Sequence, residues 1–110
     1  MDLNGKVIAI TGGGQGLGLS MALVLAAKGA QLALIDLNQD KLDHAANLCV
    51  EAGGAAKAYI ANVANEDQVI STFDQIVEDF GNLDGLINNA GILRDGPVSY
   101  THLRAHETRR

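Results

Sequence analysis

Short apolar segments alternate along most of this chain with longer segments whose apolar residues recur at helical spacing. Four short runs of mainly Val, Ile, Leu and Ala predict buried strands at residues 6–11, 31–36, 56–62 and 83–91. Three helical segments lie between these runs, and each ends at a glycine. Strands joined through a helix run parallel, so the alternation predicts an α/β fold, with four strands and three helices forming a doubly wound parallel sheet.

The three predicted helices differ in how clearly their faces and ends are marked. In the second, Asn38 is placed to cap the amino end. In the third, Asn65 and Gln68 predict a capping box, followed by an apolar stripe from Val69 to Phe80. In the first, the residues at helical spacing are Leu17, Met21, Val24, Leu25 and Lys28.

A glycine-rich turn, TGGGQGLG, connects the first predicted strand to the first helix. Gly12, Gly16 and Gly18 follow the spacing G-x-x-x-G-x-G. Such glycines permit a tight turn, a close backbone approach to a pyrophosphate, and packing of the helix on the strand. The amino end of the helix then offers free N–H groups to the phosphates. An ordinary glycine-rich turn is the alternative, but the strand before it and the helix after it favour phosphate binding.

A single carboxylate, Asp36, ends the second predicted strand, 18 residues after Gly18. A carboxylate at this place can accept hydrogen bonds from both hydroxyls of an adenosine ribose. It would repel the additional phosphate of NADP, so the sequence favours NAD as the cofactor. The alternative is a solvated acid in the turn before Asn38.

Polar residues also follow the third and fourth predicted strands. The fourth runs into NNAG, residues 88–91, and the third ends at Asn62 and Val63. Adjacent amides at the end of a buried strand need hydrogen bonds to backbone or ligand, although residues of an ordinary turn could take the same places. Because parallel strands end at one edge of a sheet, these residues are predicted to cluster where a nucleotide would bind.

TGGGQGLG, Asp36, Asn62–Val63 and NNAG together resemble the short-chain dehydrogenase/reductase family, over residues 5 to about 96. The resemblance implies an NAD-binding Rossmann domain, of which residues 1–96 would be the N-terminal part. It also implies that Gly12, Gln15, Gly16, Leu17 and Gly18 line the pyrophosphate. In the same way, Asp36 and Leu37 would hold the adenosine ribose, Asn62 and Val63 the adenine, and Asn89, Ala90 and Gly91 the nicotinamide-side ribose.

The resemblance implies hydride transfer between a nicotinamide and a ketone or secondary alcohol. GILRD after NNAG is similar to the 3-oxoacyl-(acyl-carrier-protein) reductase branch, which implies a 3-oxoacyl thioester among the substrates. Asp36 departs from the many NADPH-dependent members of that branch. The alternative function is a dinucleotide-binding module without catalysis.

The last residues, 97–110, contain Ser99, Tyr100 and Arg104, which imitate a catalytic Ser and Tyr-x-x-x-Lys set. They come too soon after NNAG for another strand to place them, and arginine does not replace lysine in this role. The run from Val98 resembles a translated sequencing adapter, and the alternative is a natural, divergent C-terminus. We therefore expect a non-native or disordered tail, no catalytic residue in the chain, and a fragment that is inactive by itself.

Composition and charge restrict the partners. Residues 1–96 hold five Lys and Arg against twelve Asp and Glu, which argues against nucleic-acid binding. No apolar run is long enough for a membrane span, and the single cysteine, Cys49, favours a reducing cytoplasm and a small buried side chain. We expect no metal site and a small carbonyl or alcohol substrate. The family resemblance implies a homotetramer or homodimer.

Overall fold

A computed structural model describes residues 3–89, which form an α/β unit of four strands and three helices. Ala90, Gly91 and the predicted tail at 97–110 lie outside the described residues. The elements alternate in the predicted order. They are β1 (Val7–Thr11), α1 (Gly16–Ala27), β2 (Gln31–Asp36), α2 (Gln39–Glu51), β3 (Ala55–Ile60), α3 (Glu66–Phe80) and β4 (Gly85–Asn88).

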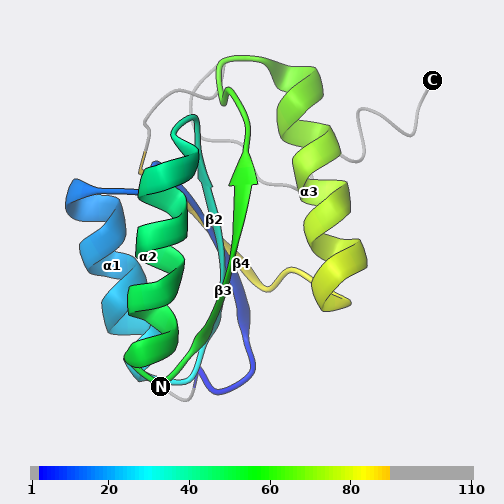
Figure 1. Ribbon diagram of the computed structural model, residues 1–110. Helices are drawn as coiled ribbons and strands as arrows, with labels where there is room; N and C mark the ends of the chain where they lie inside the picture. Colours follow the sequence, from blue (N-terminus) through cyan, green and yellow to red (C-terminus); the bar gives the residue numbers. More distant parts are fainter. Residues whose placement is uncertain (1–2, 90–110) are drawn as a thin grey trace.

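The four strands form one parallel sheet in the order β3-β2-β1-β4. β1 is central, with Ala9 paired to Ala33 of β2 on one side and to Leu86 of β4 on the other. All four strands end at the same edge, which is uppermost in Figure 1. The doubly wound parallel sheet predicted from the sequence is confirmed, and the predicted bounds of three strands differ from the observed ones by one or two residues within the described part.

The helices cover both faces of the sheet, with α1 and α2 on one face and α3 on the other (Figure 1). Alternate residues of β2 serve the two faces. Leu32 and Leu34 belong to the core under α1 and α2, whereas Ala33 and Ile35 belong to the core under α3. Burial of β2 on both sides explains why its sequence is almost continuously apolar.

Two of the apolar residues at helical spacing in α1 do not face the sheet. Leu17 and Val24 are 67% and 57% exposed. The buried positions, spaced one turn apart, are instead occupied by the small residues Gly18, Ala22 and Ala26. Apolar side chains surround this helix, so periodicity alone does not identify the inner face. Small side chains occupy it because they allow the helix to lie close to the strands.

The helix ends follow the predicted capping residues. Asn38 Oδ1 accepts from Lys41 N at 3.0 Å, and Asn65 Oδ1 accepts from Gln68 N at 3.1 Å. Gly81, with φ 90°, ends α3 in the left-handed conformation that glycine adopts at low cost. The Gln68 side chain does not complete the capping box at Asn65, because it accepts from Asn62 N instead, at 2.9 Å.

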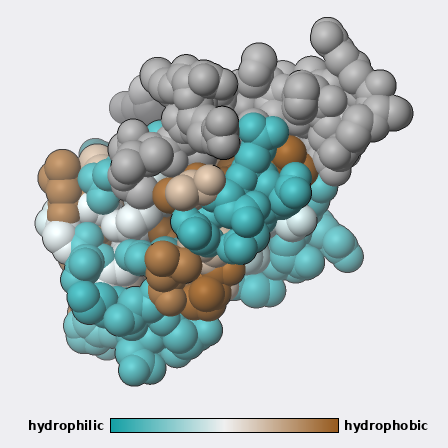
Figure 2. Space-filling model, turned by 90° about the horizontal axis from the view of Figure 1, so that it is seen from above, coloured by the Kyte–Doolittle hydropathy of each residue, from teal (hydrophilic) through white to brown (hydrophobic). Residues whose placement is uncertain are grey.

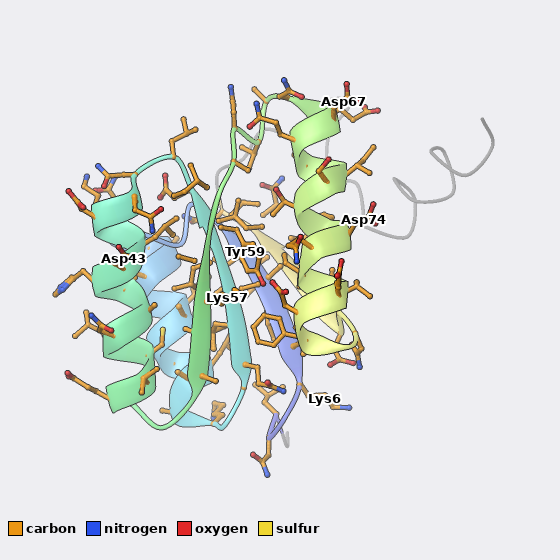
Figure 3. The ribbon with its side chains drawn as sticks, turned by 45° about the vertical axis from the view of Figure 1, so that its right-hand side comes forward. Lys6, Asp43, Lys57, Tyr59, Asp67 and Asp74 are labelled. Carbon is orange, nitrogen blue, oxygen red and sulfur yellow. The ribbon has the colours of Figure 1, made fainter. Side chains whose placement is uncertain are left out.

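A polar cluster joins β3 to α3. Lys57 and Tyr59 lie on β3 on the side of α3 (Figure 3), where Asp79 Oδ2 contacts Lys57 Nζ at 3.1 Å and accepts from Tyr59 Oη at 2.7 Å. Burial, together with the bond to Asp79, raises the pKa of Tyr59. The hydrogen bond from Tyr59 is the main cause of the lowered pKa of Asp79, with further contributions from Gln75 and Lys57. The cluster therefore favours a neutral phenol and an ionised carboxylate.

Candidate functional site

The turn between β1 and α1 places glycine backbone at the edge where the strands end. Gly12 and Gly16 have φ of 67° and 58°, a region that side-chain-bearing residues rarely adopt. Gly12 N and Gly13 N both donate to Ile35 O, at 2.7 and 3.2 Å, which anchors the turn to β2. The predicted tight turn is thus present and is fixed by main-chain bonds.

Gly18 lies where the first turn of α1 crosses back over the glycine turn. A Cβ at this position would lie 2.1 Å from Gly12 O and 2.8 Å from Asn89 Nδ2. Backbone carbonyl oxygens cannot move away as a flexible side chain could. The third glycine of the motif is therefore required for the close packing of helix, turn and β4.

The amino end of α1 is available to an anion. Gln15 is the N-cap residue, but its side chain makes no capping bond and instead accepts from Lys41 Nζ of α2. No acidic residue occurs in the first turn, so the positive end of the helix dipole is not neutralised by the helix's own side chains. The predicted pyrophosphate residues Gly12, Gln15, Gly16, Leu17 and Gly18 thus lie together around a helix amino end.

Asp36 ends β2 directly beside the glycine turn. Its Oδ2 accepts from Gly14 N at 3.2 Å, and its Oδ1 accepts from Leu37 N at 2.7 Å. The residue is half-buried, and a Cβ on Gly14 would lie only 3.0 Å from Oδ2. The carboxylate is held against the turn and does not project into solvent as an isolated turn acid would.

Both amides at the end of β4 bond to β1 or the turn after it. Thr11 is fully buried, and its Oγ1 donates to Asn88 Oδ1 at 2.8 Å. Asn89 Nδ2 donates to Gly12 O at 3.3 Å. The adjacent asparagines therefore have backbone and side-chain partners at this half-buried strand end, and they join β4 to the glycine turn.

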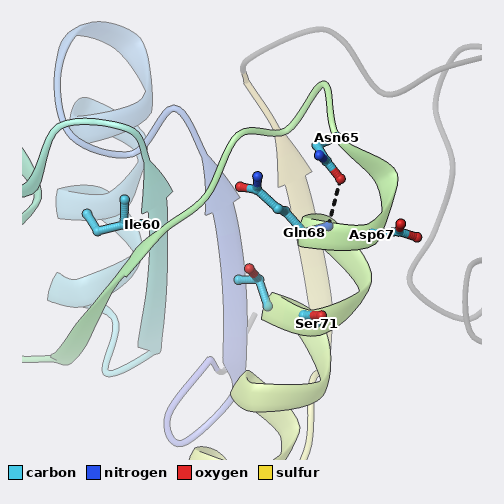
Figure 4. Close-up of a pocket in the computed structure, with 6 residues that line it drawn as sticks. Ile60, Asn65, Asp67, Gln68 and Ser71 are labelled. Atoms are coloured by element: carbon cyan, nitrogen blue, oxygen red, sulfur yellow. Dashed lines mark hydrogen bonds between the residues drawn. The ribbon is translucent and has the colours of Figure 1, made fainter.

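Asn62 and Val63 form part of the loop between β3 and α3. Asn62 Oδ1 accepts from Ala64 N at 2.9 Å, while Asn62 N donates to the Gln68 side chain. Val63 is half-buried and packs on the core under α3. The Gln68 side chain thus holds the loop, while Gln68 N donates to the capping residue Asn65, a bond drawn in Figure 4.

Large hydrophobic side chains are exposed near the strand ends. Leu17 follows the glycine turn, Leu37 follows β2, and Ile60 ends β3; their exposed fractions are 67%, 65% and 47%. From above, hydrophobic patches lie among hydrophilic side chains (Figure 2). Apolar surface beside polar backbone suits a ligand that has both apolar rings and charged groups.

An open hollow of about 350 Å³ lies at the start of α3 (Figure 4). It is lined by Ile60, Asn65, Asp67, Gln68, Ser71 and Thr72. It adjoins the Asn62 loop through Gln68 and does not include the glycine turn. The glycine turn and Asp36, where a helix amino end, main-chain donors and a carboxylate converge, are the better candidate for the functional site.

One sequence interpretation outside this edge can also be compared with the structure. Cys49 is fully buried in the core under α1 and α2, and burial raises the pKa of its thiol, as expected for a small structural side chain. Among residues 3–89, no three His, Cys, Asp or Glu side chains are grouped so that they could hold a metal ion. No helix in this same part is long and apolar enough to cross a membrane.

The sequence patterns did not identify Lys41 as a neighbour of the glycine turn, nor Gln68 as the residue whose side chain holds the Asn62 loop. Lys41 carries no motif, and its contact with Gln15 joins residues 26 positions apart. Its place in the first turn of α2, directly after a strand that ends at the site, was the signal available. For Gln68, the capping pattern identified the residue but not the direction of its side chain.

Comparisons with known proteins give a consistent answer. The model of a family described as short chain dehydrogenase matches residues 6–108. The chain is 40% identical over 96 residues to 2-(S)-hydroxypropyl-CoM dehydrogenase 3 of Xanthobacter autotrophicus, covering 87% of this chain and 38% of the relative. It is 36% identical over 95 residues to 3-oxoacyl-(acyl-carrier-protein) reductase FabG of Thermotoga maritima, covering 86% and 39%.

Solved structures agree with these relatives. An NAD⁺-bound xylitol dehydrogenase superposes with a TM-score of 0.79 at 41% identity, covering 88% of this chain and 40% of that one. A levodione reductase superposes with a TM-score of 0.77 at 38% identity, covering 82% and 36%. The chain thus spans about two fifths of the length of the proteins that it matches.

Proposed function

The chain belongs to the short-chain dehydrogenase family, and on this premise we propose that its strand-end edge binds NAD as part of an NAD-dependent oxidoreductase. The whole protein would transfer a hydride between the nicotinamide and a ketone or secondary alcohol. The observation that carries this proposal is the Asp36 carboxylate, held beside the glycine turn by Gly14 N and Leu37 N.

We assign the dinucleotide to the edge in the order of the strands. The pyrophosphate would bind at the amino end of α1, where Gly16 leaves the backbone open, Gly12 forms the tight turn and Gly18 lets the helix pack closely on that turn. Gln15 and Leu17 flank that position. The adenosine ribose would bind at Asp36 and Leu37, the adenine at Asn62 and Val63, and the nicotinamide-side ribose along Asn89, Ala90 and Gly91.

Asp36 also carries the proposed preference for NAD over NADP. A carboxylate can accept hydrogen bonds from both ribose hydroxyls, whereas a phosphate on one of them would bring two anions together. The NAD⁺-bound state of the similar xylitol dehydrogenase is consistent with this preference.

The substrate class follows from the relatives only in outline. Their names describe a hydroxypropyl compound, a 3-oxoacyl thioester of a carrier protein, and a sugar alcohol. We propose a small carbonyl or alcohol substrate and keep a 3-oxoacyl thioester as one member of that class. A cytoplasmic homotetramer or homodimer remains our proposal for the whole protein. Size-exclusion chromatography with light scattering would test the assembly.

The test of the proposed function is cofactor binding by the full-length protein. Titration with NADH and NADPH, followed by nucleotide fluorescence, is expected to show tighter NADH binding. Asp36→Ser is expected to weaken NADH binding and to reduce or reverse the preference. Tighter NADPH binding by the unsubstituted protein would contradict the assignment of Asp36. Absence of binding to either nucleotide would contradict the proposed function itself.

A further inference from the structure

Two backbone N–H groups converge on the Asp36 carboxylate. Gly14 N, in the glycine turn, and Leu37 N, after β2, lie 3.2 and 2.7 Å from its two oxygens. Converging N–H groups form a cradle that suits an anion. The side chain of Asp36 thus occupies a small anion-binding arrangement made by two different loops.

Lys41 brings a cation to the same place from α2. The residue lies in the first turn of the helix, where its N donates to Asn38 Oδ1, so its backbone is fixed by the helix cap. Its Cβ would lie 3.2 Å from a Cβ placed on Gly14, and its Nζ donates to Gln15 Oε1 in the glycine turn. The side chain therefore spans the gap between α2 and the turn, beside the Asp36 cradle.

The charge of Lys41 is not neutralised by its own contact. Its side-chain partner, Gln15, is a neutral amide. Within residues 3–89 the structure shows one ion pair, between Lys57 and Asp79, and Lys41 is not part of it. Asp36 and Lys41 thus flank Gly14. The negative charge of Asp36 would repel a phosphate bound there, and the positive charge of Lys41 would attract it.

We propose that Lys41 is a specificity-determining residue that opposes Asp36 and sets how strongly a phosphorylated ribose is rejected. This inference rests on the proposed function, because it concerns the adenosine ribose placed at Asp36. A phosphate on that ribose would meet repulsion from the Asp36 carboxylate and attraction from the Lys41 ammonium. If the carboxylate were removed, Gly14 N, Leu37 N and Lys41 would together bind the phosphate.

A purely structural role for Lys41 gives a different expectation. If Lys41 only holds the glycine turn against α2 through Gln15, its loss would weaken NADH and NADPH binding by the same factor. If it acts on the phosphate, its loss would weaken NADPH binding much more than NADH binding. The ratio of the two dissociation constants separates these roles. If Lys41 acts on the phosphate, Lys41→Arg keeps the positive charge and should preserve the ratio that the loss of Lys41 changes.

The experiment measures dissociation constants of NADH and NADPH for the full-length protein. In the Asp36→Ser background, Lys41→Met is expected to raise the NADPH constant relative to the NADH constant by about tenfold, the effect of one close charge pair near a protein surface. The effect should shrink as salt is added. Lys28→Met, which removes an exposed lysine at the opposite end of α1, is the matched control and should leave the ratio unchanged.

Each outcome bears on a different claim. An unchanged ratio in Asp36→Ser/Lys41→Met, with NADH still bound, would overturn the role of Lys41 and leave the proposed function intact. A ratio that changes equally in Lys28→Met would also overturn it, because any surface cation would then suffice. If the unsubstituted protein binds neither nucleotide, the proposed function fails first.

Discussion

The two helices that flank the candidate site are held to the sheet in opposite ways. α1 presents Gly18, Ala22 and Ala26 to the strands, and its preceding turn is fixed by main-chain bonds to β2 as well as by side chains from other elements. α3 presents larger side chains, such as Phe73 and Ile76, and its preceding loop is fixed by side chains, such as Gln68. The contact of α1 with the strands therefore tolerates little added side-chain volume. The contact of α3, by comparison, depends on the large side chains that fill it and on the polar side chains that hold its loop.

Removal of volume under α3 should have the largest effect. Phe73 is completely buried, so Phe73→Ala should lower the free energy of unfolding by about 3–5 kcal/mol, through lost burial and the cavity left behind. Urea unfolding of the full-length protein, followed by circular dichroism, measures it. Val77→Ala, on a half-buried position of the same helix, is the control and should cost clearly less. Equal losses for both variants would contradict the importance that we give to Phe73.

The second-largest loss in the free energy of unfolding should follow from adding one carbon atom between α1 and the glycine turn. Gly18→Ala would place a Cβ 2.1 Å from Gly12 O, so the free energy of unfolding should fall by about 1–3 kcal/mol through overpacking, and NADH affinity should fall as well. Thermal unfolding and NADH titration measure the two effects.

Gly16→Ala distinguishes the effect of steric crowding from the effect of an unfavourable backbone conformation. Gly16 has φ 58°, but no atom lies within 4 Å of its added Cβ. The expected loss in the free energy of unfolding is about 1 kcal/mol, from the left-handed conformation alone. A loss larger than that of Gly18→Ala would show that steric crowding is not the main requirement on the α1 side.

A smaller loss in the free energy of unfolding is expected when the hydrogen bond from Asn62 N to the Gln68 side chain is removed. Gln68→Leu removes the acceptor for Asn62 N and should cost about 1 kcal/mol, the usual net value of one hydrogen bond. Gln68→Glu keeps an acceptor oxygen and is the control. Hydrogen exchange at the Asn62 amide should accelerate in the first variant only. Unchanged hydrogen exchange at the Asn62 amide in Gln68→Leu would show that Gln68 does not hold this loop in place.

Substitutions in the polar cluster of Lys57, Tyr59 and Asp79 should change the free energy of unfolding least at neutral pH, and Tyr59 should add a distinct effect at high pH. The pKa of Tyr59 is raised in the folded state, so its contribution is fully present below the unfolded value of about 10 and is lost as pH rises beyond it. The pKa of Asp79 is lowered, so its contribution is lost in acid, as pH falls through the folded value.

Tyr59→Phe tests the alkaline part of this behaviour. The urea midpoint of the unsubstituted protein should fall between neutral pH and about pH 11, and the fall should be smaller in the variant, which has no phenol to ionise. Asp43, on the exposed side of α2, provides the control Asp43→Asn, which should retain the full alkaline loss. The same alkaline loss in Tyr59→Phe would assign it to other groups.

The same contrast explains what the sequence could predict. β2 was predicted with its observed bounds, because a strand buried on both faces is apolar throughout. The burial of Phe73 and Ile76 was also predicted, because large apolar residues mark the inner face of α3. The inner face of α1 was not predicted, since large apolar residues at helical spacing, such as Leu17 and Val24, lie on its exposed side.

Contacts within the site were predictable in place but not in detail. The convergence of the glycine turn, Asp36 and Asn89 follows from parallel strands that end at one edge. The bond from Asn89 to Gly12 and the reach of Lys41 to Gln15 depend on side-chain conformations, which no spacing rule encodes. Sequence patterns thus brought the residues of the candidate site together, and the structure showed which side chains and backbone groups they contact.

The bond between Asn89 and Gly12 joins residues 77 positions apart, and the bond between Thr11 and Asn88 spans the same separation. Long separations delay contact formation, because a large loop must close before the contact contributes. During synthesis, the glycine turn leaves the ribosome long before the strand that supports it on its other side. The glycine turn therefore has its full set of supporting contacts only after β4 has been added, so we expect that a nascent chain ending before residue 89 does not hold a nucleotide.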